Sequence, residues 1–298
     1  MSISLSRLID SQPLIVADGG MGTMLFAQGL QRGKSPELWN VDRTDAVRHV
    51  HAAYIAAGSQ VILTNTFGGS RARLATHGLA ERVAELNRAA AQLARAEADE
   101  APRPVVVAGS IGPTGSMLAP LGNLAFEDAA ALFAEQAAAL VDGGVDVLWI
   151  ETMSDLEEVR AAVEGCRQVS AQTPLVVTMT FDTRGRTMMG ITPEKAAQTL
   201  DSMSLIAFGA NCGRGPDELE ATIERMHAAV PTAVLVAKAN AGLPRMVGTE
   251  AVYDATPDLM ADYARRVTAK GARIVGACCG STPDHIRAIA QAVSSIAI

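Results

Sequence analysis

Cysteine, aromatic residues and long apolar runs are all scarce in this chain. Only 4 of its 298 residues are cysteine, and 4% are aromatic. No apolar run approaches the roughly 20 residues that a bilayer-spanning helix needs, and the opening segment MSISLSRLIDSQPLIVADGG lacks the apolar core of a secretory signal. We therefore expect free thiols, a reducing compartment and a cytoplasmic location.

Positive charge is also in deficit. The 25 Lys and Arg residues are outnumbered by 32 Asp and Glu, which gives a net charge of −7. An acidic chain has no general attraction for a phosphate backbone or an anionic membrane surface. We therefore expect neither nucleic acid nor a membrane as a partner. The apolar fraction of 49% is enough for a sizeable core, in one large α/β domain or two ordinary ones.

What the chain does have is a regular alternation of short apolar runs and helical segments. Eight runs are continuously apolar, which is typical of parallel strands covered on both faces. They are residues 13–20, 60–69, 104–113, 145–152, 174–181, 204–213, 233–242 and 272–280. This pattern predicts an α/β fold, a (β/α)8 TIM barrel, with residues 1–298 as a single domain. A doubly wound open sheet is the alternative, although the first turn lacks its G-x-G-x-x-G phosphate loop.

Three of the four cysteines fall at predicted strand ends, where such barrels place their active sites. Cys212 ends the sixth apolar run, and Cys278 and Cys279 end the eighth, whereas Cys166 falls within a predicted helix. Three soft thiolates at one rim favour Zn²⁺, and three protein ligands leave the open position of a catalytic site. Such an electron-rich site favours a substrate thiol, which indicates alkyl transfer to sulfur. Simple packing of the adjacent cysteines beside glycines is the alternative.

The motifs at the strand ends resemble those of the homocysteine S-methyltransferases over essentially the whole chain. They are DGGMGT, TNTFGG, GSIGPTG, ETMSD, GANCG and GACCGSTPDHI. The resemblance implies a (β/α)8 barrel that binds one zinc through Cys212, Cys278 and Cys279. It also implies an enzyme that transfers a methyl group to the thiolate of homocysteine and so makes methionine.

The same resemblance assigns roles to other residues at the rim. It places Asp18 and Glu151 near the homocysteine ammonium, where carboxylates accept charge-assisted hydrogen bonds. A turn or a helix cap is the alternative role for Asp18. The backbone N–H groups of Gly19 and Gly20 are the candidates for binding the carboxylate. The residues expected to orient ligands or loops, or to serve only in turns, are Asn65, Thr66 and Asn211.

The methyl donor is expected to be a free onium compound, since the chain leaves no length for a folate-binding or cobalamin-binding module. A betaine-type donor comes first, S-methylmethionine or S-adenosylmethionine second, and a corrinoid or folate partner third. Aromatic faces bind cations, and Trp39 is the candidate, with packing as its alternative role. The family's betaine enzyme has a tyrosine near its metal after the second strand, and TNTFGG has none there.

Two other classes of protein stay open on the sequence. A zinc lyase or hydrolase would need a general base at the rim, and all five histidines fall on predicted helices. A non-catalytic zinc- or thiol-binding protein would need a full ligand set, and no fourth cysteine is at the rim. The oligomeric state is open, with a homo-oligomer among the options. So are the fourth ligand of the resting site and the choice between methionine synthesis and donor demethylation as the physiological role.

Overall fold

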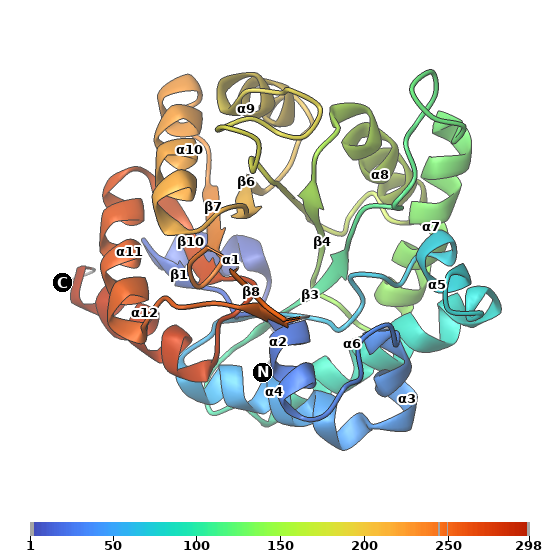
Figure 1. Ribbon diagram of the computed structural model, residues 1–298, viewed down its shortest axis with the longest axis horizontal. Helices are drawn as coiled ribbons and strands as arrows, with labels where there is room; N and C mark the ends of the chain where they lie inside the picture. Colours follow the sequence, from blue (N-terminus) through green and yellow to red (C-terminus); the bar gives the residue numbers. More distant parts are fainter. Residues whose placement is uncertain (1–2, 244, 249, 297–298) are drawn as a thin grey trace.

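The computed structural model describes residues 3–243, 245–248 and 250–296. A barrel of parallel strands lies at its centre and is surrounded by helices (Figure 1). Each strand begins within one of the eight predicted runs, so the prediction of a (β/α)8 barrel is confirmed. The strands are β1 (Ile15–Val16), β2 (Val61–Leu63), β3 (Val106–Ile111), β4 (Val147–Met153), β5 (Leu175–Met179), β6 (Ala207–Cys212), β7 (Leu235–Ala239) and β10 (Ala272–Ala277).

Hydrogen bonding between neighbouring strands follows the order β1-β10-β7-β6-β5-β4-β3-β2. The ring closes between β1 and β2 through the bridge that joins Ala17 to Val61. Gln60 supports this closure, because its N–H donates to Val16 O at 2.7 Å and its side-chain Oε1 accepts from Val16 N–H at 3.0 Å. In a barrel of eight strands, alternate side chains point inward and fill the interior. The carboxyl ends of all eight strands therefore meet at one rim.

Helices cover the outside of the barrel, and several begin with sequence signals that are easily recognised. Among the described residues, four α-helices start with proline, whose fixed φ suits the first helical position. The long helices are α4 (Thr44–Ala57), α6 (Val83–Glu100), α7 (Phe126–Asp142), α8 (Leu156–Val169), α9 (Pro193–Asp201), α10 (Pro216–Ala229), α11 (Pro257–Ala269) and α12 (Pro283–Ile296). The short ones are α1 (Leu5–Ser11), α2 (Met21–Ala27), α3 (Trp39–Asp42), α5 (Arg71–Ala75) and the 3-10 turns η1 (Pro36–Leu38) and η2 (Ala80–Arg82).

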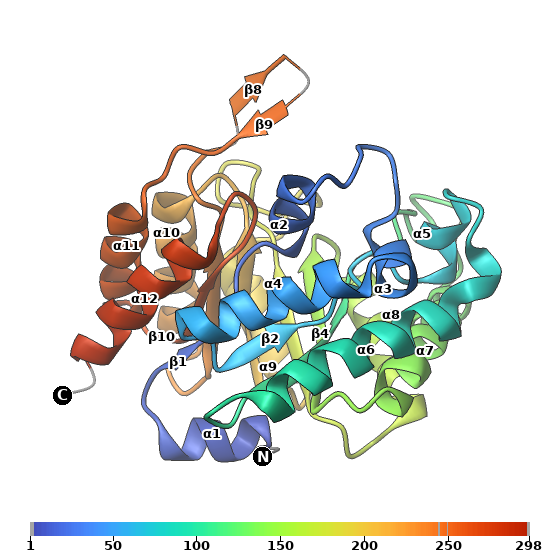
Figure 2. The ribbon, with the colours of Figure 1, turned by 90° about the horizontal axis from the view of Figure 1, so that it is seen from below.

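The two ends of the barrel carry different additions, as Figure 2 shows. At the amino ends of the strands, α1 packs Leu5, Leu8 and Ile9 into the apolar interior. Above the carboxyl ends stands the antiparallel hairpin of β8 (Arg245–Val247) and β9 (Glu250–Val252), which the sequence did not indicate. Among the described residues, no helix combines the length and apolarity that crossing a bilayer requires.

Candidate active site

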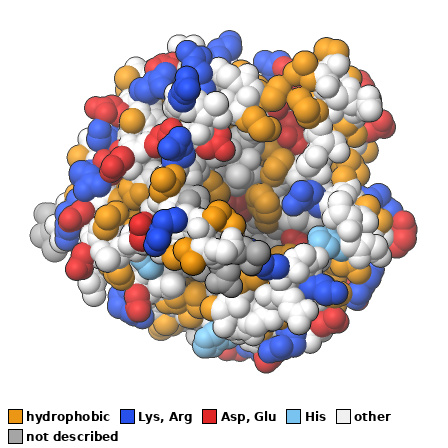
Figure 3. All heavy atoms as spheres, viewed as in Figure 1, with side chains coloured by type: hydrophobic (Ala, Val, Ile, Leu, Met, Phe, Trp, Pro, Cys, Tyr) orange, Lys and Arg blue, Asp and Glu red, His pale blue; other side chains and the backbone are white. Residues whose placement is uncertain are grey.

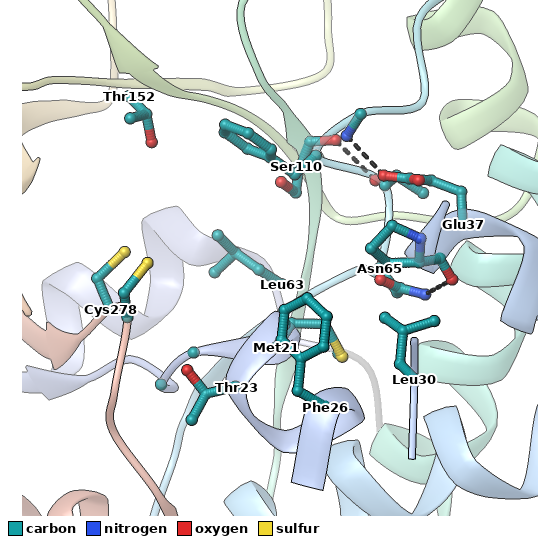
Figure 4. Close-up of a pocket in the computed structure, with 18 of the residues that line it drawn as sticks. Met21, Thr23, Phe26, Leu30, Glu37, Leu63, Asn65, Ser110, Thr152 and Cys278 are labelled. Carbon is teal, nitrogen blue, oxygen red and sulfur yellow. Dashed lines mark hydrogen bonds between the residues drawn. The ribbon is translucent and has the colours of Figure 1, made fainter. Parts of the chain in front are cut away.

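A cavity of about 1170 Å³ opens at the carboxyl ends of the strands, and it appears as the hollow near the centre of Figure 3. Cys278 lies at one end, and Glu37 and Asn65 lie at the other (Figure 4). The cysteine end is buried, because Asp18 and Glu151 there are 1% and 8% exposed, and Glu37 and Asn65 at the other end are each 4% exposed. The cavity opens to solvent along the wall that carries the exposed Phe26 and Phe67.

The three cysteines predicted at the rim come together at the buried end of the cavity. The Sγ atoms of Cys212, Cys278 and Cys279 all lie within 4.8 Å of one another, and those of Cys212 and Cys278 are 3.0 Å apart. Sulfurs bound at about 2.3 Å to one tetrahedral zinc lie roughly 4 Å apart, so this set of soft donors fits the ion. Cys166 is buried in α8, as predicted.

The backbone at these strand ends is shaped to aim the sulfurs at one another. Cys212 has φ of +58° and Thr152, at the end of β4, has φ of +63°, a region that costs energy for residues other than glycine. The side chain of Asn240 ties the two cysteine segments together. It donates from Nδ2 to Gly213 O at 2.7 Å and accepts at Oδ1 from Cys279 N–H at 3.1 Å. Asn240 is therefore a positioning residue for the cluster.

Negative charge is stabilised within the cluster itself. Hydrogen bonds from Cys212 and Cys278 lower the pKa of the Cys279 thiol to about 3. The contact with Cys278 raises the pKa of Cys212, because its proton is held in that bond. Three sulfurs thus share a thiolate charge that a bound cation would neutralise.

Glu151 lies beside the sulfur cluster at the end of β4. The Ser110 hydroxyl donates to its Oε1 at 2.5 Å, and Asn211 Nδ2 lies 3.5 Å from its Oε2. Burial raises the pKa of Glu151 to about 7. Asn211 Nδ2 also lies 3.8 Å from Cys212 Sγ and 4.0 Å from Cys278 Sγ, so it links the carboxylate to the thiols. Glu151 lines the cavity and keeps the capacity to accept further hydrogen bonds.

Asp18 also lies at this end of the cavity, but its carboxylate is already engaged. Its Oδ1 accepts from Lys238 Nζ at 2.7 Å, and its Oδ2 accepts from Leu63 N–H at 2.7 Å. Burial raises the pKa of Asp18, while Lys238 opposes that rise. These bonds compete with the predicted binding of the substrate ammonium by Asp18.

The glycines after β1 are required by close packing. A Cβ atom at Gly19 would lie 2.5 Å from Ser281 Oγ, and one at Gly20 would lie 2.7 Å from Cys278 O. The Gly20 N–H donates to Ser281 Oγ at 2.9 Å. That bond competes with the carboxylate role expected for Gly20.

Asn65 and Thr66 line the cavity, but their side chains bind the surrounding chain. Asn65 Nδ2 donates to Pro36 O at 2.8 Å and to Asn40 Oδ1 at 2.9 Å. The Thr66 hydroxyl donates to Ser110 O at 2.6 Å. These contacts hold the loop after β2, which is the loop-orienting role among those expected.

Trp39 is not among the residues that line this cavity, so the donor role expected for it needs correction. It begins α3, where the Arg43 guanidinium lies 4.9 Å from the centroid of its ring. A cation of the chain itself therefore lies over the ring that was expected to bind the donor. Phe26 and Phe67 line the cavity instead and are 49% and 39% exposed.

Two lining residues close to the cluster were missed from the sequence. Lys238 lies in the apolar run of β7, where a single lysine was the only signal. Tyr253 follows β9, and its side chain helps to lower the pKa of the Cys279 thiol. A Cβ atom at Gly280 would lie 2.1 Å from Tyr253 Cγ, so the glycine makes room for the ring. A tyrosine therefore does reach the cluster, from the seventh strand-to-helix segment.

Known proteins share both the sequence and the architecture of this chain. The methionine synthases of Mycobacterium leprae (strain TN) and Mycobacterium tuberculosis (strain ATCC 25618 / H37Rv) are each 34% identical to it, over 95% and 96% of its length. The matched regions are 24% and 25% of those proteins, so the chain spans about a quarter of the length of these curated relatives.

Solved structures and a family profile extend the likeness. The metallated form of the homocysteine methyltransferase MmuM from Escherichia coli has a TM-score of 0.82 and 27% identity, covering 96% of this chain and 99% of that one. Its oxidized form has a TM-score of 0.81. The profile of the family described as homocysteine S-methyltransferase matches residues 15–293, which include all three clustered cysteines. The chain therefore belongs to the homocysteine S-methyltransferase family.

Proposed function

We propose that this protein transfers a methyl group to the thiol of homocysteine, giving methionine and the demethylated donor. The observation that carries the proposal is the cluster of three thiols beside Glu151, at the buried end of the cavity. Family membership supports the same reaction.

Cys212, Cys278 and Cys279 are the residues that would hold Zn²⁺. When bound there, the ion supplies an open, soft position at which a thiol loses its proton near neutral pH. The cluster is already assembled without substrate. Asn240 hydrogen-bonds the two segments that carry the cysteines, and Asn211 lies near the sulfurs of Cys212 and Cys278. Little reorganisation is then needed when substrate arrives.

Glu151 is the residue we assign to the homocysteine ammonium. It lines the cavity, where Ser110 donates to its Oε1 and Asn211 lies at its Oε2, and each carboxylate oxygen can accept a further hydrogen bond. An arriving ammonium would favour the ionised carboxylate and so offset the burial that raises the pKa of Glu151. A charged pair formed in this buried setting is stronger than one in water.

For the donor we propose a small onium compound, a betaine-type one before S-methylmethionine or S-adenosylmethionine. The methyl group of an onium donor is activated by positive charge, so the protein need only align it with the thiolate. Phe26 and Phe67 offer aromatic faces for that charge. Arg73 and His77 line the same cavity and suit the carboxylate that betaine and S-methylmethionine both carry. A corrinoid or folate donor is third in this order.

A zinc- or thiol-binding protein without catalysis is the competing class. Metal storage gives no reason to bury a carboxylate beside the cluster or to keep a cavity of about 1170 Å³ open to it. The cavity and Glu151 therefore favour a protein that takes a substrate.

A panel of methyl donors tests the proposal. The zinc-loaded protein is incubated with homocysteine and, separately, betaine, S-methylmethionine, S-adenosylmethionine, methylcobalamin and methyltetrahydrofolate, and methionine is measured by mass spectrometry. We expect methionine from at least one onium donor, in wild type and in Cys166→Ala alike. Methionine only from methylcobalamin or methyltetrahydrofolate would overturn the donor assignment. No methionine from any donor, with no change in the sulfur shell of the metal on adding homocysteine, would overturn the reaction.

A further inference from the structure

Lys238 is a charged residue near the carboxyl end of the buried strand β7. Its register partners are Asn211 on β6 and Gly276 on β10. Asn211 reaches Glu151 inside the barrel rim, and Lys238 reaches Asp18 there, so both side chains point to the interior. The Lys238 side chain is 3% exposed. An ammonium buried this deeply is costly unless it is paired.

The pairing of Lys238 leaves part of its hydrogen-bonding capacity unused. An ammonium has three N–H donors, and Asp18 Oδ1 accepts one of them at 2.7 Å. The Trp149 ring, with its centroid 5.7 Å from Nζ, covers another side without accepting a conventional hydrogen bond. Among the described residues, no other hydrogen bond to this nitrogen is found. Because Lys238 lines the cavity, its remaining donors can serve a ligand there.

Charge balance at the buried end of the cavity indicates which ligand group that is. Asp18, Glu151 and the three thiols are all groups that become negative, and homocysteine adds a carboxylate to its thiolate. The other Lys and Arg side chains of the cavity wall, Arg32 and Arg73, belong to exposed residues. Lys238 is therefore the cation placed to receive the substrate carboxylate, while the Gly20 N–H is held by Ser281.

We propose that Lys238 Nζ binds the α-carboxylate of homocysteine while Glu151 receives its α-ammonium, so that Lys238 sets the preference for an amino-acid thiol. This rests on the proposed function and adds the basis of its substrate selectivity. Asp18 then acts through Lys238 as a positioning residue. Its short ion pair holds the lysine ammonium at the cavity wall.

The test compares two thiols that differ only in the carboxylate. L-homocysteine and 3-aminopropane-1-thiol, which is homocysteine without that group, are titrated into the zinc-loaded protein by calorimetry. We expect wild type to bind homocysteine about 10- to 100-fold more tightly, the scale of a charged hydrogen bond. In Lys238→Met, the two thiols should bind with affinities within about threefold of each other, because only homocysteine has a carboxylate that loses its interaction with Lys238. The surface variant Lys270→Met should keep the wild-type ratio.

A second variant guards against damage to the fold. Lys238→Met leaves the Asp18 carboxylate buried without its cation, whereas Lys238→Met combined with Asp18→Asn removes both charges together. Zinc content and circular dichroism report whether each variant is intact. The inference is overturned if either intact variant keeps the wild-type ratio, or if wild type binds both thiols equally. Binding of neither thiol by wild type would instead overturn the proposed function on which the inference rests.

Discussion

The two ends of this barrel are built from the same eight strands but differ in kind. The amino-terminal half is filled by apolar side chains and sealed by α1. The carboxyl-terminal end buries Asp18, Glu151 and Lys238 beside three partly exposed thiols. Burial of apolar side chains stabilises a fold, whereas burial of charged groups costs free energy unless they are well paired. The comparison teaches that one end supplies stability and the other uses some of it to hold a reactive site.

The backbone at the site is also unusual. Thr152, the next-to-last residue of β4, and Cys212, the last residue of β6, are both left-handed. Such conformations persist only where the surrounding structure enforces them, and here Asn211 binds the backbone and side chain of Thr152. Ser204, which precedes β6 at the opposite end, is left-handed as well, so backbone strain is not confined to the site. The side chains still differ in kind between the two ends, and changes at the two ends should have separable effects.

The largest effect is expected from the cysteines. Replacing Cys212, Cys278 or Cys279 by Ala should abolish methionine formation and remove most of the zinc, which we expect at one ion per chain in wild type. The reason is that two sulfurs cannot hold the ion as three do. Cys166→Ala, a buried thiol outside the cluster, should change neither quantity. Metal analysis of purified protein checks this, and full zinc retention in all three cluster variants would falsify the assignment.

The opposite end should respond in stability alone. Leu5 in α1 is fully buried in the barrel interior. Leu5→Ala should lower the free energy of unfolding by about 2–5 kcal/mol, since it removes buried methyl groups and leaves a cavity. Urea denaturation measures the loss. The homocysteine KM and the zinc content of the folded variant should stay at wild-type values, and a large change in either would break the division between the ends.

Glu151→Gln should increase the free energy of unfolding above neutral pH, because it removes a buried charge from the site. Burial raises the pKa of Glu151 from 4.5 to about 7 in the folded protein. The folded chain therefore holds a proton that the unfolded chain has released, and stability falls as pH rises across that window. At pH 8 the variant should be more stable than wild type by up to roughly 3 kcal/mol. The gain should vanish at pH 4, and denaturation at the two pH values tests this.

The same variant should lose substrate affinity. Glu151→Gln keeps the shape of the side chain but removes the charge proposed to bind the ammonium. The homocysteine KM should rise about 10- to 100-fold, the scale of ~1.5–3 kcal/mol for a charged hydrogen bond. Steady-state kinetics at saturating donor measures this, with zinc content as the control. An unaltered KM would mean that Glu151 is only structural.

The smallest effect is expected at the mouth of the cavity. Phe26→Ala or Phe67→Ala should weaken donor affinity by about 0.5–2 kcal/mol, because each removes an aromatic face from the wall. Trp39→Ala is the matched control and should leave donor affinity unchanged, since Trp39 lies outside that wall. Donor KM values for the three variants decide between these positions. A loss of donor affinity in Trp39→Ala alone would instead support the sequence-based prediction that Trp39 binds the donor.

The sequence by itself determined the architecture and the sulfur site. Eight continuous apolar runs separated by helical segments admit few arrangements other than a parallel barrel. The carboxyl ends of the strands then share one rim, so cysteines at the ends of the sixth and eighth runs had to approach each other. Helix starts such as Thr192-Pro193 and Thr256-Pro257 are local signals that need no tertiary context.

Only the tertiary structure decided which neighbours each polar side chain would have. Lys238 and Asp18 are 220 residues apart, and their ion pair depends on the register of β7 and on the closure of the ring. The Trp39 ring packs under the Arg43 guanidinium. Tyr253 lies close to Cys279 because it follows a β-hairpin that the sequence pattern did not predict. Periodicity reports which residues are buried, because burial follows from local repeats. It does not report which buried groups meet, because those contacts are set by packing across strands that are distant in sequence.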